Sequence, residues 1–419
     1  MHVATDAPRF RIEFYRCGSI LERLHEGVTG WFDGRNANPG KPGERWHWPA
    51  FRIALPLGWR SGAYVALFIE GSHDGLDRTR PNRGDPDGRE ARVLFVVRNL
   101  TCTAPTLYNL PLFTYHAYNV AHVDGTQRDN EGECLYSGAD AVSLHRPGGG
   151  TGGHPWDEVN VDFYDEATPR QTFAHWDGKA IAWLEKNEFS VDYCTDLDLH
   201  RDPELVQRYS LFLAFGHNEY WSDPMREQIE RFIESGGKVA FFGGNTCWFR
   251  VAVDEAELAI SRAGRWEDRC EHFLTGVSFR NGGGKWIGER PPTGYRVTDP
   301  DHWIYEGCAV GRGSVFGAQH RLIGYECDGA CDDAQFLTLG TTSLESWDVR
   351  DGSGEISQNA HATMGIRASG SVFNAATTDW ARVLHEGDPI VERITRNVVS
   401  RFSSRRRPLR SVPSLGSSS

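Results

Sequence analysis

Two short apolar runs on either side of an amphipathic segment form the clearest pattern in this chain. Residues 211–215 (LFLAF) and 239–242 (VAFF) carry no charge, which is typical of strands buried on both faces of a sheet. Between them, Ser222 is a favoured N-cap residue, apolar positions recur at helical spacing, and glycines at 236 and 237 mark an end. The pattern predicts a strand, a helix and a parallel strand, with a polar turn after each strand.

Other segments extend this alternation from residue 105 to residue 402. Further strands are predicted over 106–113, 189–194 and 371–375, a helix over 175–186, and a last helix that opens at Asp388 and Pro389. Such alternation predicts a parallel sheet with helices on both faces. We expect a β-rich insertion at about 255–345, where glycines and short β-like runs are frequent, and a disordered tail over 403–419.

The first 104 residues differ, because their apolar runs are short and are separated by turn residues. Strands are predicted over 10–15, 51–55, 62–69 and 91–97. Short strands at such intervals predict a β-sandwich. The expected fold class is therefore α/β plus β, with an N-terminal β-sandwich (1–104) followed by a parallel-sheet, three-layer catalytic domain (105–402).

Composition narrows the classes of function. The 45 basic and 57 acidic residues give a net charge of −12, and the absence of a basic motif disfavours nucleic-acid binding. No apolar run approaches membrane-spanning length and the first ten residues hold no signal-peptide core, so we expect a cytoplasmic protein without membrane contacts. The nine scattered cysteines fit reduced thiols. We expect a small-molecule substrate, and a homo-oligomer is left open.

Polar residues follow four of the predicted strands. They are Tyr118, the pair Asp196 and Asp198, the cluster from His217 to Tyr220, and Asn245. Because ligands bind beyond the carboxyl ends of parallel strands, these residues are expected to converge on one site, although helix capping suits the two aspartates better than catalysis. No Ser or Cys takes the turn position of a nucleophile elbow, and no glycine-rich phosphate loop opens a helix.

The donors in this cluster are mainly oxygens, which suit hard cations. A phenolate ligand needs a strongly polarising ion, because the reference pKa of tyrosine is about 10. Ferric iron would meet this need, and two phenolates with one carboxylate would balance its charge.

The motif GHNEYWS at residues 216–222 resembles that of the N,N-dimethylformamidase large-subunit family. The resemblance extends in order to AYN (117–119), LY (135–136), DYCTDLDLH (192–200), FFGGNTCWFR (241–250) and GYECD (324–328), and covers most of residues 10–400. It implies a β-sandwich followed by an α/β domain that resembles class I glutamine amidotransferases without their cysteine nucleophile. The chain is much shorter than the formamidase and no small partner subunit is in view, so the substrate is left open.

The resemblance also implies a mononuclear ferric iron held by two tyrosines and one glutamate. Glu219 matches the glutamate, and by order along the chain Tyr118 and Tyr136 match the two tyrosines. His217 and Asn245 match residues that lie around the metal in the family. Without a ligand role, Glu219 would be a helix-start carboxylate, the tyrosines would be cleft aromatics, and Asn245 would be a left-handed cap residue.

We therefore predict an iron-dependent hydrolase of an amide or related C–N bond in a small molecule. Glu219 or His217 would manage protons, and Asn245 would orient the substrate or support a developing oxyanion. One alternative is a non-hydrolytic metalloenzyme (a lyase, cyclase or oxygen-using enzyme) on the same Tyr/Tyr/Glu site. Another is a carbohydrate-binding protein that uses the 14 tryptophans. Glu326 is expected to be a structural support, with no role in the chemistry.

Overall fold

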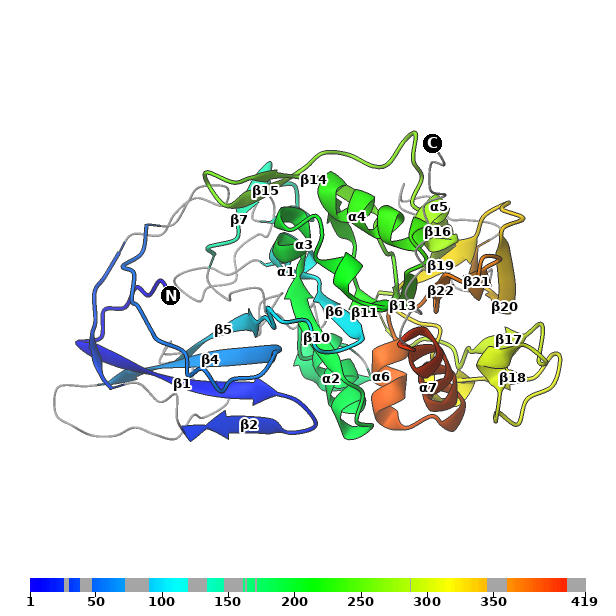
Figure 1. Ribbon diagram of the computed structural model, residues 1–419, viewed down its shortest axis with the longest axis horizontal. Helices are drawn as coiled ribbons and strands as arrows, with labels where there is room; N and C mark the ends of the chain where they lie inside the picture. The colour runs from blue at the N-terminus through cyan, green and yellow to red at the C-terminus, as the bar shows by residue number, and fades with distance from the viewer. Residues whose placement is uncertain are drawn as a thin grey trace, which may run out of the picture.

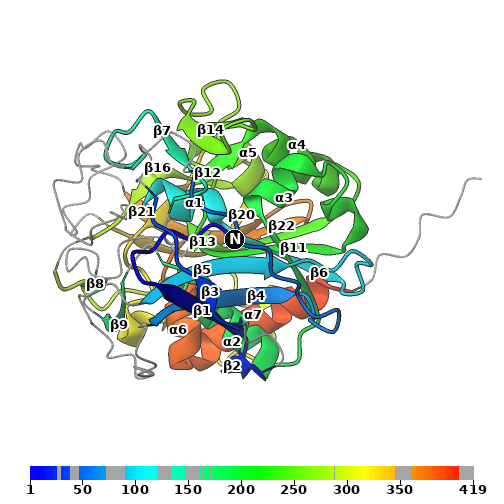
Figure 2. The ribbon, with the colours of Figure 1, turned by 90° about the vertical axis from the view of Figure 1, so that its left-hand side faces the viewer.

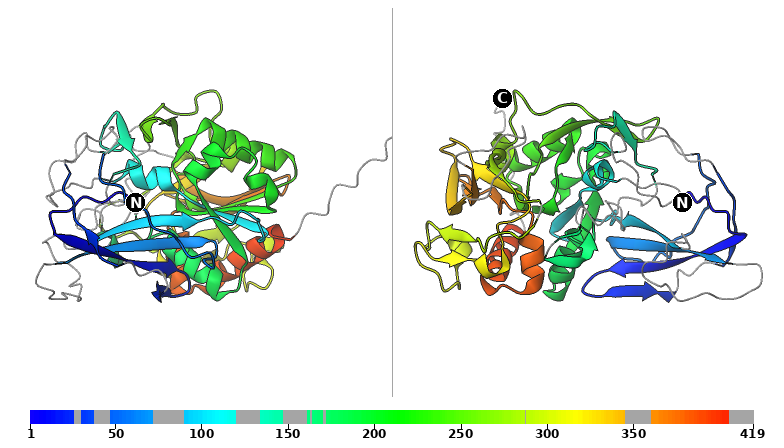
Figure 3. Two further views of the ribbon diagram at one scale, coloured as in Figure 1. Left: turned by 60° about the vertical axis from the view of Figure 1, so that its left-hand side comes forward. Right: turned by 180° about the vertical axis from the view of Figure 1, so that it is seen from behind.

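The computed structural model describes residues 1–25, 30–37, 47–71, 90–119, 134–146, 161–162, 164–169, 172–286, 288–344 and 360–404. One large sheet occupies the centre and one end of the molecule, and a smaller N-terminal sheet occupies the other end (Figure 1). Two further views show the same separation (Figure 3). Most of the predicted disordered tail, 405–419, lies outside the described residues.

The large sheet has nine strands. In spatial order they are β10 (Val191–Thr195), β6 (Thr106–Leu110), β11 (Leu211–His217), β13 (Lys238–Gly244), β22 (Val372–Asn374), β21 (His361–Arg367), β20 (Phe336–Ser343), β17 (Tyr295–Val297) and β18 (Val315–Phe316). The first five are mutually parallel, whereas each pair from β22 onward is antiparallel. The sheet is therefore mixed.

The predicted parallel three-layer domain resembling class I glutamine amidotransferases is wrong, because this mixed sheet belongs to a mostly β fold. The reason lies partly in the link between β21 and β22, which covers only residues 368–371. A link of this length joins antiparallel neighbours, whereas a parallel pair needs a crossover of a dozen or more residues. Strands β17, β18 and β20, from the region expected to be a β-rich insertion, extend the same sheet.

Helices pack against both faces of the parallel strands. On one face lie α2 (Asp177–Lys186), α6 (Trp380–Glu386) and α7 (Pro389–Phe402), and on the other lie α3 (Asp196–Arg201) and α4 (Asp223–Glu234), as Figure 2 shows. The alternation along β11 explains this arrangement, because Leu211, Leu213 and Phe215 join one buried cluster while Phe212 and Ala214 join the other. Burial on both faces requires the uncharged sequence of this strand.

The predicted N-terminal β-sandwich is also wrong. The described residues of this region form one antiparallel sheet, composed of β1 (Arg9–Cys17), β2 (Leu21–Leu24), β3 (Phe32–Asp33), β4 (Gly62–Gly71) and β5 (Glu90–Val97). The segment predicted as a strand over 51–55 has no regular structure, and its Phe51 and Ile53 pack over Phe10 and Phe14. An irregular segment thus covers the face that a second sheet would cover. The predicted domain limits at residues 104 and 402 stay predictions.

Smaller elements lie beyond the carboxyl ends of the parallel strands. They are α1 (Leu112–Ala117), a four-stranded sheet of β12 (Tyr220–Ser222), β14 (Phe249–Asp254), β15 (Ala259–Arg262) and β7 (Ala141–Ser143), and a pair formed by β16 (Val277–Gly283) and β19 (Cys327–Ala330). The remaining pieces are β8 (Val161–Asp162), β9 (Asp165–Pro169), α5 (His272–Thr275) and 3-10 turns at Val206–Arg208, Trp303–Tyr305 and Ala318–His320. No helix among the described residues is long and apolar enough to cross a membrane.

Candidate functional site

Glu219 lies in the turn between β11 and β12, at the carboxyl end of the parallel strands. Its backbone N–H and that of Tyr220 both donate to the hydroxyl of Thr114 on α1, at 3.0 and 3.2 Å. Before the turn, Gly216 has a φ of +67°, and a Cβ there would lie 2.5 Å from the Cβ of Trp176. The turn therefore needs a glycine at position 216. Within this turn, the Glu219 side chain is buried.

Three neighbours contact the Glu219 carboxylate. The Tyr118 hydroxyl donates to Oε2 at 2.7 Å, the Asn245 amide donates to Oε1 at 3.1 Å, and Nε2 of His217 lies 3.5 Å from Oε2. Burial raises the pKa of Glu219 to about 7; the charge of Glu326 adds to this rise, whereas His217 and Tyr118 oppose it. Glu219 is thus the central member of a buried polar cluster.

Glu326 is a second carboxylate in this cluster, and sequence reasoning missed it. Its Oε2 lies 2.7 Å from Nε2 of His217, the Asn245 amide lies 3.4 Å from the same oxygen, and the Trp286 indole donates to Oε1 at 3.2 Å. Burial lowers the pKa of His217, but the charges of Glu326 and Glu219 outweigh this effect, so the pKa is raised overall. The motif GYECD, which contains Glu326, carried the signal that could have identified it.

Glu326 is positioned by a residue that follows another strand of the large sheet. Its backbone N–H donates to the hydroxyl of Thr378 at 3.2 Å, and its carbonyl accepts from the Thr378 N–H at 3.0 Å. Thr378 lies just beyond β22, so the carboxyl end of this parallel strand also contributes to the cluster.

Tyr118 and Tyr136 lie side by side at the edge of the cluster, with ring centroids 4.9 Å apart. Tyr118 follows α1 and is partly buried, whereas Tyr136 is 63% exposed. The Tyr136 N–H donates to the carbonyl of Ala117, and Arg262 donates to the carbonyl of Leu135 at 2.9 Å. These bonds attach the Tyr136 segment to α1 and to β15.

The chemistry of the two phenols bears on whether a metal could be held here. Burial raises the pKa of Tyr118 well above its usual value, and the charge of Glu219 adds to the effect. Burial, followed by the charges of Glu326 and Glu219, raises the pKa of Tyr136 as well. A hard cation among these oxygens would reverse the effect and favour phenolates, so the donor set fits such an ion.

Other side chains do not form an alternative metal centre in the part of the chain that the structure describes. Within that part, no group of three or more His, Cys, Asp and Glu is arranged to hold a metal ion. The predicted ligands, Tyr118, Tyr136 and Glu219, would not form such a group, because only Glu219 is a His, Cys, Asp or Glu.

Asp196 and Asp198 lie outside the cluster and support its framework. Asp196 accepts hydrogen bonds from the Asn109 amide at 2.7 Å and the Phe113 N–H at 2.8 Å. Asp198 forms a capping box with Thr195 at the start of α3. Asp196 thereby holds the start of α1, the helix that carries Thr114 and leads to Tyr118.

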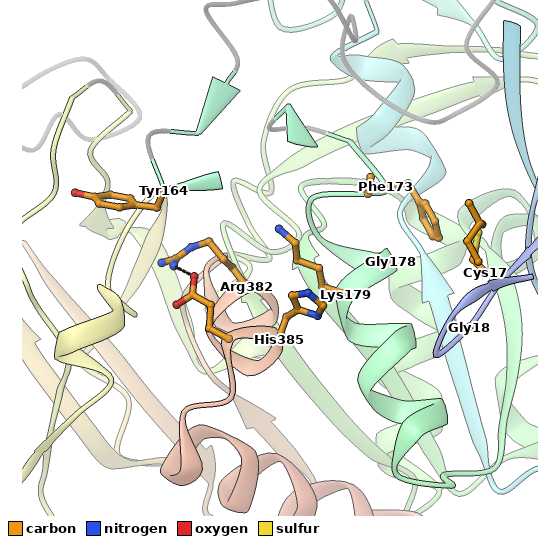
Figure 4. Close-up of a pocket in the computed structure, with 11 residues that line it drawn as sticks. Cys17, Gly18, Tyr164, Phe173, Gly178, Lys179, Arg382 and His385 are labelled. Atoms are coloured by element: carbon orange, nitrogen blue, oxygen red, sulfur yellow. Dashed lines mark hydrogen bonds and ion pairs between the residues drawn. The ribbon is translucent and has the colours of Figure 1, made fainter. Parts of the chain in front are cut away.

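A separate cavity of about 520 Å³ lies between the N-terminal sheet and the helices α2 and α6. Lys179, Arg382 and His385 lie on its helix side, and Cys17 lies on its strand side (Figure 4). None of the predicted site residues lines this cavity. The cluster around Glu219 brings together all five predicted site residues and Glu326, with Tyr136 exposed at its edge, and it is the candidate site.

The family model described as "N,N-dimethylformamidase beta subunit-like, C-terminal" matches residues 37–393. No curated protein matches the chain. The matched range contains Tyr118, Tyr136, His217, Glu219 and Asn245, and it also contains Glu326.

Proposed function

Since the chain belongs to the N,N-dimethylformamidase beta subunit-like family, we propose that it hydrolyses an amide or a related C–N bond of a small molecule. One observation carries the proposal: His217 and Asn245 are buried beside two tyrosines, and each of them contacts both buried carboxylates, Glu219 and Glu326. The cluster contains proton donors and acceptors for hydrolysis. None of its six members is a Ser or Cys nucleophile, so we assign water as the attacking group.

We propose that Tyr118, Tyr136 and Glu219 hold one ferric ion. When bound, such an ion supplies Lewis acidity toward a substrate carbonyl or a water. Support comes from the three oxygen donors that the fold gathers from three separate segments. Burial, and then the nearby carboxylates, raise the pKa of both phenols, so only a strongly polarising cation would make them phenolates.

His217 is assigned to proton transfer. Its Nε2 lies between Oε2 of Glu326 at 2.7 Å and Oε2 of Glu219 at 3.5 Å, so a proton on Nε2 is stabilised by two carboxylates. A proton held there can pass to a departing amine. Glu326, held by the Trp286 indole, is assigned to keep the imidazole in this orientation and to accept a proton in turn.

The carbohydrate-binding alternative gains no support from the tryptophans. Trp176, Trp221 and Trp380 are fully buried, and of the tryptophans within the described ranges only Trp31, at 41%, counts as exposed. Packing in the core therefore accounts for the six buried tryptophans of the described ranges. The non-hydrolytic alternative is separated from hydrolysis by product analysis in the experiments below.

The metal assignment is tested by iron content and visible absorption of the purified protein. We expect one iron per chain and a phenolate-to-iron absorption band, with both reduced in Tyr118→Phe and in Tyr136→Phe. Tyr220→Phe is the matched control, because its ring lies 6.1 Å from that of Tyr118 and its hydroxyl accepts a hydrogen bond from Arg262. A protein that stays iron-free after reconstitution would overturn the metal assignment.

The hydrolytic assignment is tested by amine and carboxylate release from a panel of small amides. We expect stoichiometric release by the iron-loaded protein and loss of activity in Glu219→Ala with retention of the fold. Glu230→Ala is the control, since Glu230 lies on α4 in ion pairs with Arg226 and Arg269. Full activity in Glu219→Ala, or products other than amine and acid, would overturn the proposal.

A further inference from the structure

Thr114 on α1 contacts the main chain of two of the three proposed metal ligands. Its hydroxyl accepts the Glu219 N–H at 3.0 Å, and its carbonyl accepts the Tyr118 N–H at 3.2 Å. We infer that Thr114 is a positioning residue that aligns Glu219 with Tyr118 before a metal binds. The inference rests on the proposed metal assignment and adds to it a residue that lies outside the ligand set.

The spacing of Thr114 and Tyr118 places both side chains on one side of α1. Residues four positions apart in a helix lie on the same face, and Tyr118 continues the last turn of α1 through its bond to the Thr114 carbonyl. From this face, the Thr114 hydroxyl holds the main chain of Glu219, and the Tyr118 hydroxyl donates to Oε2 of Glu219 at 2.7 Å. One short helix therefore sets both the main chain and the side chain of Glu219.

The two residues that flank Thr114 fix the position of its hydroxyl. The Phe113 N–H donates to Asp196 at 2.8 Å, and the Tyr115 hydroxyl donates to Asp177. Both aspartates are fully buried, as is Thr114 itself. Because the residues before and after Thr114 are both bonded to buried carboxylates, α1 cannot shift without breaking one of these bonds.

The turn that carries Glu219 depends on this hydroxyl for the hydrogen bonds of its N–H groups. The Glu219 carbonyl accepts the Phe249 N–H at 2.9 Å, whereas the Glu219 and Tyr220 N–H groups both donate to Thr114. Valine has nearly the same shape as threonine but offers no acceptor, so Thr114→Val would leave two buried N–H groups unpaired. The turn would then shift toward other partners, and Glu219 would lose its alignment with Tyr118.

Iron affinity and the phenolate-to-iron absorption band test the inference in the reconstituted, full-length protein. Replacing a residue that orients metal ligands typically weakens metal binding by roughly 10-fold to 100-fold. We expect a loss of this size and a weaker band in Thr114→Val, whereas Thr114→Ser, which keeps the hydroxyl, should retain both. Thr395→Val is the matched control, because Thr395 is a fully buried threonine on α7 whose hydroxyl accepts from the Trp380 indole at 2.9 Å. This control should lower the urea midpoint without changing iron affinity.

Hydrogen exchange gives a readout that needs no metal. In the iron-free protein, a peptide that covers residues 216–222 should exchange faster in Thr114→Val than in wild type, and at the wild-type rate in Thr114→Ser. Thr114→Ala removes the same hydroxyl and takes the place of the valine variant if that variant does not fold. Wild-type iron affinity in a folded variant without the hydroxyl would overturn the inference. If wild type itself takes up no iron, the metal assignment is overturned, and equal exchange in wild type and Thr114→Val would overturn the inference separately.

Discussion

Replacing Asp379 with asparagine should destabilise the fold strongly. Asp379 is fully buried between Arg290 and Arg382, which are 2% and 3% exposed. Arg382 donates to Oδ1 at 2.8 Å, and Arg290 and the Tyr325 N–H donate to Oδ2 at 3.2 and 2.7 Å. Because Tyr325 precedes Glu326, this carboxylate also supports the segment that holds Glu326 beside His217.

Two estimates bound the loss of unfolding free energy in Asp379→Asn. Removing one partner of a buried ion pair costs about 3–5 kcal/mol, since the remaining charge loses its compensation. Burial opposes ionisation of Asp379, but Arg290 and Arg382 lower its pKa from 3.8 to about 2. That difference corresponds to roughly 2 to 3 kcal/mol, because one pKa unit corresponds to about 1.4 kcal/mol. We therefore expect Asp379→Asn to lose between about 2 and 5 kcal/mol of unfolding free energy at neutral pH.

The measurement is urea unfolding followed by tryptophan fluorescence, with Asp223→Asn as the matched control. Asp223 pairs with Arg250 at 2.8 Å, but the two side chains are 37% and 44% exposed. Such surface pairs contribute at most about 1 kcal/mol. Coincident urea midpoints for the two variants would refute the reasoning.

The pH dependence of the stability difference between wild type and Asp379→Asn gives a second check. The pKa of Asp379 is lower in the folded than in the unfolded protein, so its stabilisation is present above about pH 4 and is lost as the pH falls toward 2. The gap in stability between wild type and Asp379→Asn should therefore narrow between pH 5 and pH 3. A constant gap would contradict the electrostatic explanation.

Two further predictions concern the framework of the site. Gly216→Ala should be less stable than Gly370→Ala by about 1–3 kcal/mol: both glycines have a left-handed φ, but the added methyl would lie 2.5 Å from Trp176 at position 216, and nothing lies within 4 Å at position 370. Equal urea midpoints would contradict this steric argument. Burial raises the pKa of Asp177 to about 7, although two tyrosine hydroxyls donate to it, so its contribution to stability is present below about pH 4 and is lost as the pH rises through 7. Asp177→Asn should therefore gain stability relative to wild type between pH 4 and pH 7.5 in urea titrations, and an unchanged difference would show that this carboxyl does not titrate as described.

Local patterns in the sequence predicted much of the parallel half of the large sheet. The uncharged runs correspond to β11 and β13, and the helical spacing between them corresponds to α4. The prediction that Asp388 and Pro389 open the last helix is confirmed, since the Asp388 carboxylate caps α7. These signals are reliable because periodicity and capping depend on residues within a few positions of each other. The same reasoning placed His217, Glu219 and Asn245 at strand ends that meet, whereas Tyr118 follows the helix α1 and not the strand that was predicted over 106–113.

Contacts between distant residues decided the rest. The sheet is mixed because of the direction of four strands, β17, β18, β20 and β21. Their direction depends on which strands pair and on the length of the connections between them. Glu326 lies in the site because its segment bonds to Thr378 beyond β22, and the motif GYECD marks the segment but does not show this contact. The sequence by itself determined the helices α2, α4 and α7, the buried strands β11 and β13, and the residue types of the site. The tertiary structure decided the mixed sheet and the place of the second carboxylate, because strand pairing and burial depend on the whole folded chain.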